Sequence, residues 1–351
     1  MTEVTPATRR RGASRPPQLV CVALSPSIDV TYVVPGLVPG TIHRPPQVYR
    51  VAGGKGFNVA RAAHTLGATV VATGVLGGDT GAWMVTMLSR TGIRMAQVTG
   101  PRPTRTCVAV ADRSTGELTE FYEPAPTVTP RAWSELLATV ARVCEDHPSW
   151  VSLSGSLPPG PVPEALGDLV SAAKKAGAQV AVDSHSTALA AAAGAGADLL
   201  KVNVEEAAAV LGLGPGTGYD GGGTAPRRDA AELAAGLLAV SPATQVAIVT
   251  AGADGAVLVA RDGTRLRLRL DVRGDYPVGS GDSFLGGLLT GLTRDPGDLV
   301  GAARLGMAAG AANALTPGAG VLDAATALEL AERVVVTEID DLAPTPVTLG
   351  D

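Results

Sequence analysis

The stretch Val278-Gly279-Ser280-Gly281-Asp282-Ser283-Phe284 is the strongest local signal in this sequence. Its glycines form a turn that leads directly into an amphipathic pattern, which predicts a helix. The backbone N–H groups of Gly279, Ser280 and Gly281 are then free at the positive end of the helix dipole, where they can bind phosphate oxygens or stabilise a transferring phosphoryl group. Asp282, in the first turn, can accept a proton from an attacking hydroxyl. Taken alone, the stretch fits an ordinary glycine turn with an N-terminal aspartate equally well.

A second glycine turn, Ala52-Gly53-Gly54-Lys55-Gly56-Phe57-Asn58, also precedes a helical pattern. Glycines allow a ligand to approach the backbone closely. Lys55 adds a positive charge for a phosphate, and Asn58 can bond sugar hydroxyls. The Lys-Ser or Lys-Thr ending of a P-loop is absent. The alternative is a capped turn with a solvated lysine.

A third polar segment, Ser25-Pro26-Ser27-Ile28-Asp29, follows the first apolar, β-prone run of the chain. In an open α/β sheet, ligands bind at the carboxyl ends of the strands. A carboxylate there can hold sugar hydroxyls, so Asp29 is a candidate substrate ligand. The alternative is an aspartate in an Asx turn.

Outside these turns, short apolar runs alternate with amphipathic segments, which predicts an α/β protein with a mostly parallel sheet covered on both faces. A hairpin is expected to turn at Asp262-Gly263. A turn is expected at residues 25–29. A small separate sheet is expected to form from residues 30–52 and 104–124. The expected strands are 18–24, 68–76, 150–153, 179–182, 199–202 and 246–250, and the expected helices are 58–66, 79–91, 163–176, 205–211, 229–240, 283–293 and 299–315.

The composition limits the classes of function. The 351 residues are 46% hydrophobic and only 3% aromatic, which predicts a core of Ala, Val and Leu. A net charge of −5 argues against binding to nucleic acid or to an anionic membrane. The three cysteines are widely spaced, which predicts no zinc site and no disulfide framework and favours a cytoplasmic location.

The expected organisation is one large domain over residues 18–335. Residues 1–17 carry arginines without a following apolar run, so they are interpreted as a disordered tail and not as a secretory signal. Residues 336–351 are expected to form a C-terminal tail. The glycine-rich segment 212–226 is interpreted as a mobile surface loop.

Together, in this order and at this spacing, the three motifs resemble the ribokinase-like, or PfkB-type, carbohydrate kinases over residues 19–330. VGSGDSF is similar to the C-terminal signature of that family and AGGKGFNVARAAHTLGA to its N-terminal signature. Three further segments resemble its sugar-site turn, its Mg²⁺-organising segment and its nucleotide turn, namely Ser154-Gly155-Ser156-Leu157-Pro158-Pro159-Gly160, Lys201-Val202-Asn203-Val204-Glu205-Glu206 and Thr250-Ala251-Gly252-Ala253-Asp254-Gly255.

The resemblance implies a three-layer α/β/α fold in which the small sheet forms a lid, often shared between the subunits of a homodimer. It implies ATP as phosphoryl donor, Mg²⁺ as cofactor and Asp282 as catalytic base beside Gly279, Ser280 and Gly281. Asn203 and Glu206 would organise Mg²⁺, largely through water. The implied nucleotide ligands are Lys201, Thr250, Gly252 and Gly255, and the implied substrate ligands are Asp29, Gly53, Gly54, Lys55, Asn58, Arg105 and Ser154.

Lys55 and Arg105 resemble residues of the subgroup that phosphorylates ketose phosphates, and two cations aimed at one pocket suit a dianionic substrate. Thr41 and Glu120 stand near positions where the minor phosphofructokinase of enteric bacteria carries basic residues, and Glu120 resembles the acidic residue found there in 1-phosphofructokinase. The resemblance therefore implies fructose 1-phosphate or tagatose 6-phosphate as substrate, with fructose 6-phosphate as a further candidate. The pair Tyr276-Pro277 departs from the family pattern and leaves the monovalent-cation site of the family open.

Two other functions remain open from the sequence. One is a kinase for an unphosphorylated sugar or a nucleoside. The other is a protein of this fold that binds a sugar or nucleotide without catalysis, against which the presence of Asp282 and its glycine turn argues. A Rossmann dehydrogenase is disfavoured because the glycines at 74–81 do not form a GxGxxG motif.

Overall fold

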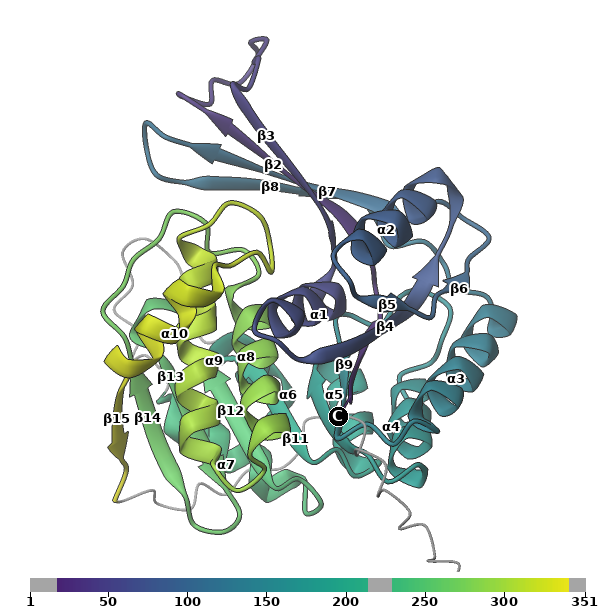
Figure 1. Cartoon of the computed structure of the whole chain (residues 1–351), viewed down its shortest axis with the longest axis vertical. Helices are drawn as coiled ribbons and strands as arrows, with labels where there is room; N and C mark the ends of the chain where they lie inside the picture. Colours follow the sequence, from purple (N-terminus) through teal and green to yellow (C-terminus); the bar gives the residue numbers. More distant parts are fainter. Residues whose placement is uncertain (1–17, 214–228, 341–351) are drawn as a thin grey trace, which may run out of the picture.

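The computed structural model of the protein describes residues 18–213 and 229–340 (Figure 1). The predicted tail 1–17, nearly all of the predicted loop 212–226 and the last part of the predicted tail 336–351 lie outside the described residues. Described helices and strands form a layered body, from which a smaller sheet projects at the top of the view (Figure 1).

The body is built on a large sheet whose strands run in the order β15-β14-β13-β12-β11-β10-β9-β1-β4-β5, with the short β6 also paired to β4. From β12 to β5 the neighbours are parallel, whereas β13, β14 and β15 are antiparallel. The strands are β1 (Gln18–Ala23), β4 (Thr69–Leu76), β5 (Arg94–Met95), β6 (Val98–Thr99), β9 (Trp150–Ser154), β10 (Gln179–Asp183), β11 (Leu199–Asn203), β12 (Val246–Thr250), β13 (Ala256–Ala260), β14 (Arg265–Arg269) and β15 (Val335–Glu338).

Helices cover both faces of this sheet. Residues of β1 alternate between two cores: Val20 and Val22 pack under α3 to α7, and Leu19 and Cys21 pack under α1, α2 and α8 to α10. The helices are α1 (Lys55–Thr65), α2 (Gly78–Arg90), α3 (Pro130–Cys144), α4 (Ala165–Lys175), α5 (Ser186–Gly194), α6 (Val204–Val210), α7 (Ala230–Val240), the 3₁₀ turn η1 (Gly252–Asp254), α8 (Ser280–Arg294), α9 (Leu299–Ala314) and α10 (Ala324–Arg333).

The smaller sheet has four strands in the order β3-β2-β7-β8. They are β2 (Ser27–Val34), β3 (Gln47–Gly53), β7 (Arg105–Asp112) and β8 (Leu118–Tyr122). Because β2 follows β1 after three residues and β3 leads into α1, the sheet is tied to the body beside the carboxyl ends of the large sheet's strands.

Small residues bring α8 unusually close to its neighbours. A Cβ on Gly286 would lie 2.9 Å from Ala62 Cβ of α1, and one on Gly291 would lie 2.6 Å from Ala302 Cα of α9. Such contacts are closer than side chains allow, so these positions require glycine. This packing fixes the start of α8 beside the start of α1, which brings the two predicted glycine turns together.

The predicted fold class is confirmed, and most predicted elements lie within three residues of the observed ones. The predicted turn at 25–29 is wrong beyond Pro26, because the backbone of Ser27 already pairs with Gly53 and Arg105. Helices α1 and α8 begin at Lys55 and Ser280, three residues before their predicted starts. The predicted starts are too late because the glycine-rich first turns have low helix propensity. The predicted C-terminal tail begins too early, because β15 pairs with β14 through Glu338.

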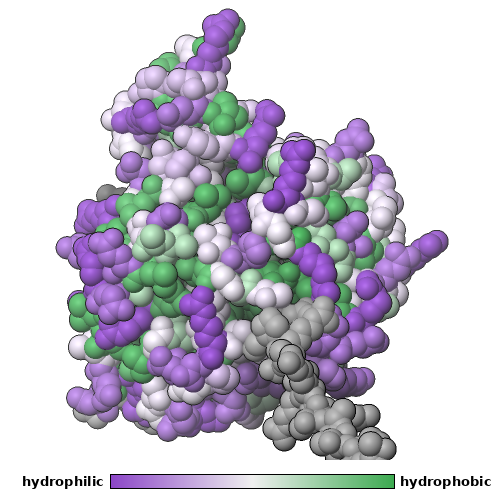
Figure 2. Space-filling model, viewed as in Figure 1, coloured by the Kyte–Doolittle hydropathy of each residue, from purple (hydrophilic) through white to green (hydrophobic). Residues whose placement is uncertain are grey.

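Figure 2 shows apolar and hydrophilic residues interspersed over one face of the molecule. Within residues 18–213 and 229–340, every helix is too short or too polar to cross a membrane.

Candidate active site

A cleft of about 1570 Å³ runs between the strand ends of the large sheet and the smaller sheet. Its lining combines residues from both glycine turns, from β2, β7, β8, β11 and β12, and from the segments that follow β9, β11 and β12. Fifteen of the predicted site residues line it, namely Asp29, Gly54, Lys55, Asn58, Arg105, Lys201, Asn203, Glu206, Thr250, Gly252, Gly255, Gly279, Ser280, Gly281 and Asp282.

The start of α8 has the geometry predicted for an anion site. Gly279 is the N-cap and adopts φ 82°, a left-handed conformation that favours glycine. A Cβ there would lie 2.6 Å from Gly320 N, so the turn also requires the close approach of the 319–320 loop. No side chain caps this helix end. The prediction of three free amides is wrong for Ser280, whose N–H donates to Pro277 O at 3.1 Å, whereas the following amides of the first turn have no helical partner.

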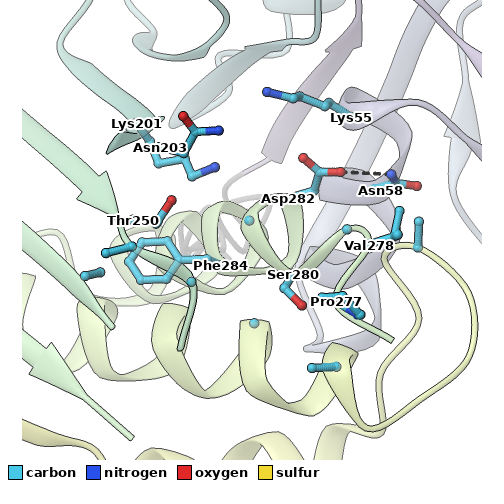
Figure 3. A pocket seen from close by; sticks show the side chains of 18 of the residues that line it. Lys55, Asn58, Lys201, Asn203, Thr250, Pro277, Val278, Ser280, Asp282 and Phe284 are labelled. Atoms are coloured by element: carbon cyan, nitrogen blue, oxygen red, sulfur yellow. Dashed lines mark hydrogen bonds between the residues drawn. The ribbon is translucent and has the colours of Figure 1, made fainter. Parts of the chain in front are cut away.

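Asp282 projects from the first turn of α8 between Asn58 and Lys201 (Figure 3). Its side chain is buried, and its Oδ2 accepts a hydrogen bond of 2.9 Å from Asn58 Nδ2. Burial, followed by the charge of Asp183, raises the pKa of Asp282 to about 7. A carboxylate with this pKa is a stronger base than an ordinary aspartate and still ionises near neutral pH.

A charged cluster lies opposite Asp282. Asp183, at the end of β10, is fully buried and accepts from Lys55 Nζ at 2.7 Å through Oδ1 and from Lys201 Nζ at 2.7 Å through Oδ2. Lys55 also contacts Glu206 Oε1 at 3.1 Å. The cluster therefore holds two ammonium groups at the strand ends beside α8, where they can attract the phosphates of a nucleotide.

The cluster sets the charge of its own members. Although burial opposes charge on both groups, the two lysines hold the pKa of Asp183 below its ordinary value, and Asp183 and Glu206 raise the pKa of Lys55. Gly281 makes room for this arrangement, because a Cβ there would lie 2.7 Å from Lys201 Nζ. Asp183 and Lys55 thus remain ionised near neutral pH, where Asp282 titrates.

Asn203 and Glu206, the predicted Mg²⁺ residues, form a capping box at the start of α6. Asn203 Oδ1 accepts from Glu206 N at 2.7 Å, and Glu206 Oε2 accepts from Asn203 N at 3.0 Å. Among the described residues, no cluster of three His, Cys, Asp or Glu could hold a metal directly. Hard oxygen donors at the cleft wall nevertheless fit Mg²⁺, which keeps most of its water and binds to substrate phosphates.

The predicted nucleotide turn follows β12 and lies on the cleft wall. Thr250 Oγ1 donates to Val202 O at 3.3 Å, which ties the turn to β11. Gly252 and Gly255 adopt φ 57° and 97°, and a Cβ on Gly255 would lie 2.0 Å from Leu268 O. All residues from Thr250 to Gly255 line the cleft, and the two glycines leave room for a ligand such as a nucleotide base or ribose to approach the backbone.

The smaller sheet supplies the other end of the cleft. Asp29 on β2 accepts from Ser27 Oγ at 2.6 Å and from Gly54 N at 3.3 Å, and burial raises its pKa. Arg105 on β7 donates to Glu123 O at 3.2 Å, and on β8 Tyr122 donates to Glu120 at 2.7 Å. These residues face the cleft from the lid side.

Two predicted site residues lie behind the lining. A Cβ on Gly53 would lie 2.0 Å from Asp29 Oδ2, so Gly53 makes room for that carboxylate. Ser154 is fully buried at the end of β9, and its Oγ has no hydrogen-bond partner among the described residues. In addition, Lys55 and Arg105, which sequence reasoning aimed at one phosphate, have different partners here: the ammonium of Lys55 is bonded to Asp183 and Glu206.

Sequence reasoning missed two residues that organise the site. Asp183 ends a buried strand at the carboxyl edge of the sheet, the same signal that selected Asp29. Arg61 lies three residues after Asn58 on α1 and donates to Asn58 Oδ1 at 3.2 Å. An arginine within an otherwise apolar helix pattern was the available signal.

Comparison with known proteins agrees with this geometry. The profile described as "pfkB family carbohydrate kinase" matches residues 17–325. The chain is 33% identical to a 1-phosphofructokinase of Rhodobacter capsulatus over 291 residues, which are 83% of this chain and 88% of that protein. It is 31% identical to a tagatose-6-phosphate kinase of Staphylococcus epidermidis over 171 residues, 49% of this chain and 54% of that protein.

Among solved structures, the fold matches phosphofructokinase-2 from Escherichia coli in complex with fructose-6-phosphate, with a TM-score of 0.76 and 27% identity over 90% of this chain and 98% of that one. One assignment follows from three observations: the glycine turn with Asp282, the charged cluster at the strand ends and the profile match over most of the chain. The chain belongs to the pfkB family of carbohydrate kinases.

Proposed function

We propose that this protein is an ATP-dependent kinase that transfers the γ-phosphoryl group to a hydroxyl of a ketose phosphate. The observation that carries the proposal is the placement of Asp282. A carboxylate with a pKa of about 7 stands at the uncapped N-terminus of a helix, opposite two ammonium groups and inside one cleft. Phosphoryl transfer needs this combination of a base, an anion site and cations.

In the proposed reaction, the substrate hydroxyl lies against Asp282 Oδ1, since Oδ2 is already bonded to Asn58. Asp282 takes the proton while the hydroxyl oxygen forms its bond to the γ-phosphorus. The bond between that phosphorus and the β,γ-bridging oxygen breaks, and its electron pair leaves with ADP. The amides at the start of α8 and the ammonium of Lys201 stabilise the charge on the equatorial oxygens.

Mg²⁺, when bound with ATP, would neutralise phosphate charge. Asn203 and Glu206 would hold it, largely through water. Lys55 and Lys201 keep their positions before ATP arrives, because Asp183 bonds both. ATP would lie along the turn from Thr250 to Gly255.

The lid end supports a phosphorylated acceptor. Among the described residues, Arg105 is the cation that the smaller sheet contributes to the cleft lining. Its guanidinium donates to a neutral acceptor, the backbone carbonyl of Glu123. A substrate phosphate would give this guanidinium a charged partner. The named relatives act on fructose or tagatose phosphates, which supports the same class. We infer fructose 1-phosphate or tagatose 6-phosphate first and fructose 6-phosphate next.

We also infer a homodimer formed through the lid. On the side of the smaller sheet opposite to Asp29, Val48 and Phe121 are 46% and 61% exposed. Exposed apolar residues on one sheet face are typical of an interaction surface. A second copy of the lid would cover them.

The test is ADP release with Mg·ATP and a panel of fructose 1-phosphate, tagatose 6-phosphate, fructose 6-phosphate, fructose, ribose and adenosine. The proposal expects turnover concentrated on one ketose phosphate. Strong turnover of fructose, ribose or adenosine would instead favour a kinase for an unphosphorylated acceptor. Silence on the whole panel, combined with tight ATP binding, would favour the non-catalytic alternative.

A further inference from the structure

Arg61 connects the proposed base to two backbone segments. Its Nη1 donates to Asn58 Oδ1 at 3.2 Å and to Ala319 O at 2.6 Å, and its Nη2 donates to Ala52 O. Asn58 in turn donates from Nδ2 to Asp282 Oδ2 at 2.9 Å. Arg61, Asn58 and Asp282 therefore form a continuous chain of hydrogen bonds that ends on the carboxylate.

The direction of this chain follows from the chemistry of its ends. A guanidinium only donates, and an ionised carboxylate only accepts. The amide of Asn58 can bridge them in one orientation alone, with its oxygen toward Arg61 and its nitrogen toward Asp282. If Arg61 were absent, nothing in this chain would stop the amide from turning its oxygen toward the carboxylate.

We propose that Arg61 is a positioning residue for phosphoryl transfer, which fixes the Asn58 amide so that it donates to Asp282 Oδ2 and leaves Oδ1 free for the substrate hydroxyl. The inference rests on the proposed function, since it takes Asp282 as the base. Arg61 itself need not contact either substrate.

Loss of Arg61 has a defined electrostatic consequence. The charged groups that act on Asp282 are Asp183 from β10, Lys55 from α1 and Lys201 from β11, and Arg61 interacts with it from the next turn of α1. A neutral residue at position 61 removes one of the cations and frees the amide donor. Both changes disfavour the charged carboxylate, so each raises the pKa of Asp282.

Arg61 also has a structural role that an experiment must separate. Ala52 lies at the end of β3, and Ala319 lies beside Gly279, where a Cβ would come within 2.8 Å of its Cα. Loss of the guanidinium would loosen these two segments as well. A loosened fold lowers turnover at every pH, whereas a shifted base lowers it mainly at low pH.

The first experiment measures kcat from pH 6 to 9 with Mg·ATP and fructose 1-phosphate, or tagatose 6-phosphate if it is turned over faster. It compares Arg61→Met and Arg61→Lys with the wild type. The matched control is Arg304→Met, because Arg304 is also half-buried and donates to a backbone carbonyl, that of Val334, far from Asp282.

We expect the acid limb of the Arg61→Met profile to lie about one pH unit above that of the wild type. If the midpoint moves from about 7 to about 8, turnover falls about eightfold at pH 6.5 and hardly at all at pH 9. Arg61→Lys, which keeps the charge and a donor, should recover part of the shift. An equal loss at every pH, or the same shift in Arg304→Met, would overturn the inference.

The second experiment needs no turnover and so separates this inference from the proposed function. The chain has only three asparagines, Asn58, Asn203 and Asn313. Selective ¹⁵N labelling of asparagine therefore gives three side-chain amide pairs, and loss of one pair in Asn58→Gln assigns the signal. In the wild type, the Asn58 signal should follow a titration near pH 7.

In Arg61→Met, and more weakly in Arg61→Lys, that titration should move upward by about one unit. An unchanged midpoint in both variants would overturn the inference even if the kinase activity is confirmed. Conversely, a shifted midpoint in a protein that turns over no sugar phosphate would refute the proposed function and leave the coupling between Arg61 and Asp282 standing.

Discussion

The two ends of the cleft are built differently. At the body end, Asn58, Asp183, Lys201 and Asp282 are all less than 7% exposed, and their side chains are bonded in two pairs, Asn58 with Asp282 and Lys201 with Asp183. At the lid end, Glu120 and Tyr122 are exposed and their side chains bond to each other, while Arg105 donates to a backbone carbonyl. The groups proposed for catalysis are thus already held in position at the body end, whereas the groups proposed to bind the substrate lie on an exposed surface.

This difference follows from the fold. The body end lies where parallel strands stop under two helix starts, so its polar groups are enclosed and must be paired. The lid is a four-stranded sheet with one face toward the cleft, and water can satisfy its groups until a ligand arrives. We therefore expect substitutions at the body end to affect stability and rate, and those at the lid end to affect substrate affinity.

The largest effect on stability should come from Asp183→Asn. Removing this buried charge leaves Lys201 without its carboxylate partner, so the free energy of unfolding should fall by about 3–5 kcal/mol. Glu135→Gln is the control, because Glu135 forms an exposed ion pair with Arg131 at 3.0 Å. That variant should lose about 1 kcal/mol or less. Equal losses in urea unfolding would contradict the contrast.

A smaller effect, of opposite sign, is expected for Asp282→Asn. Burial raises the pKa of Asp282 to about 7 in the folded protein, so between about pH 4 and 7 only the folded state holds this proton. The wild type therefore loses stability as the pH rises through this window. The variant should be more stable above pH 7, by at most about 4 kcal/mol, and equal near pH 4. Melting temperatures at pH 5 and 8 would show this, and an equal difference at both would refute it.

The lid should respond through affinity. Arg105→Ala should raise KM for the sugar phosphate about 30-fold, since a charge-assisted contact contributes about 2 kcal/mol. The values of kcat and of the unfolding free energy should change little. Arg113→Ala is the control on the same sheet, because Arg113 bonds Gln47 and does not line the cleft. A fall in kcat with unchanged KM would place Arg105 in the chemical step instead.

Much of the site could be predicted because its motifs are local. Gly279, Gly281 and Asp282 lie within four consecutive residues, and the turn preference of glycine can be seen without a structure. Two features escaped for a physical reason. The pairing of Lys55 with Asp183 joins positions 128 residues apart, and nothing in a single sequence reveals that the ammonium turns toward the strand ends. Likewise, the role of Arg61 depends on the end of β3 at Ala52 and on the loop at Ala319, which come together only in the fold.

The lid shows the same limit. The alternation of apolar and polar residues in β7 and β8 predicted strands. The early start of β2 at Ser27, by contrast, depends on its pairing with β3 on one side and β7 on the other. Pairing with the neighbouring strands therefore outweighs the local turn propensity of this segment. The burial of Ser154 behind the lining is another such case, since a strand end can face either side of a sheet.

We propose Asp282 as the base of a sugar-phosphate kinase. The most direct test of this role compares wild type and Asp282→Asn in ADP release with Mg·ATP and the best ketose phosphate at pH 8, with Mg·ATP affinity measured in parallel. We expect kcat to fall about a thousandfold while the Kd for Mg·ATP changes less than about threefold. Turnover within about tenfold of the wild type would contradict this role of Asp282.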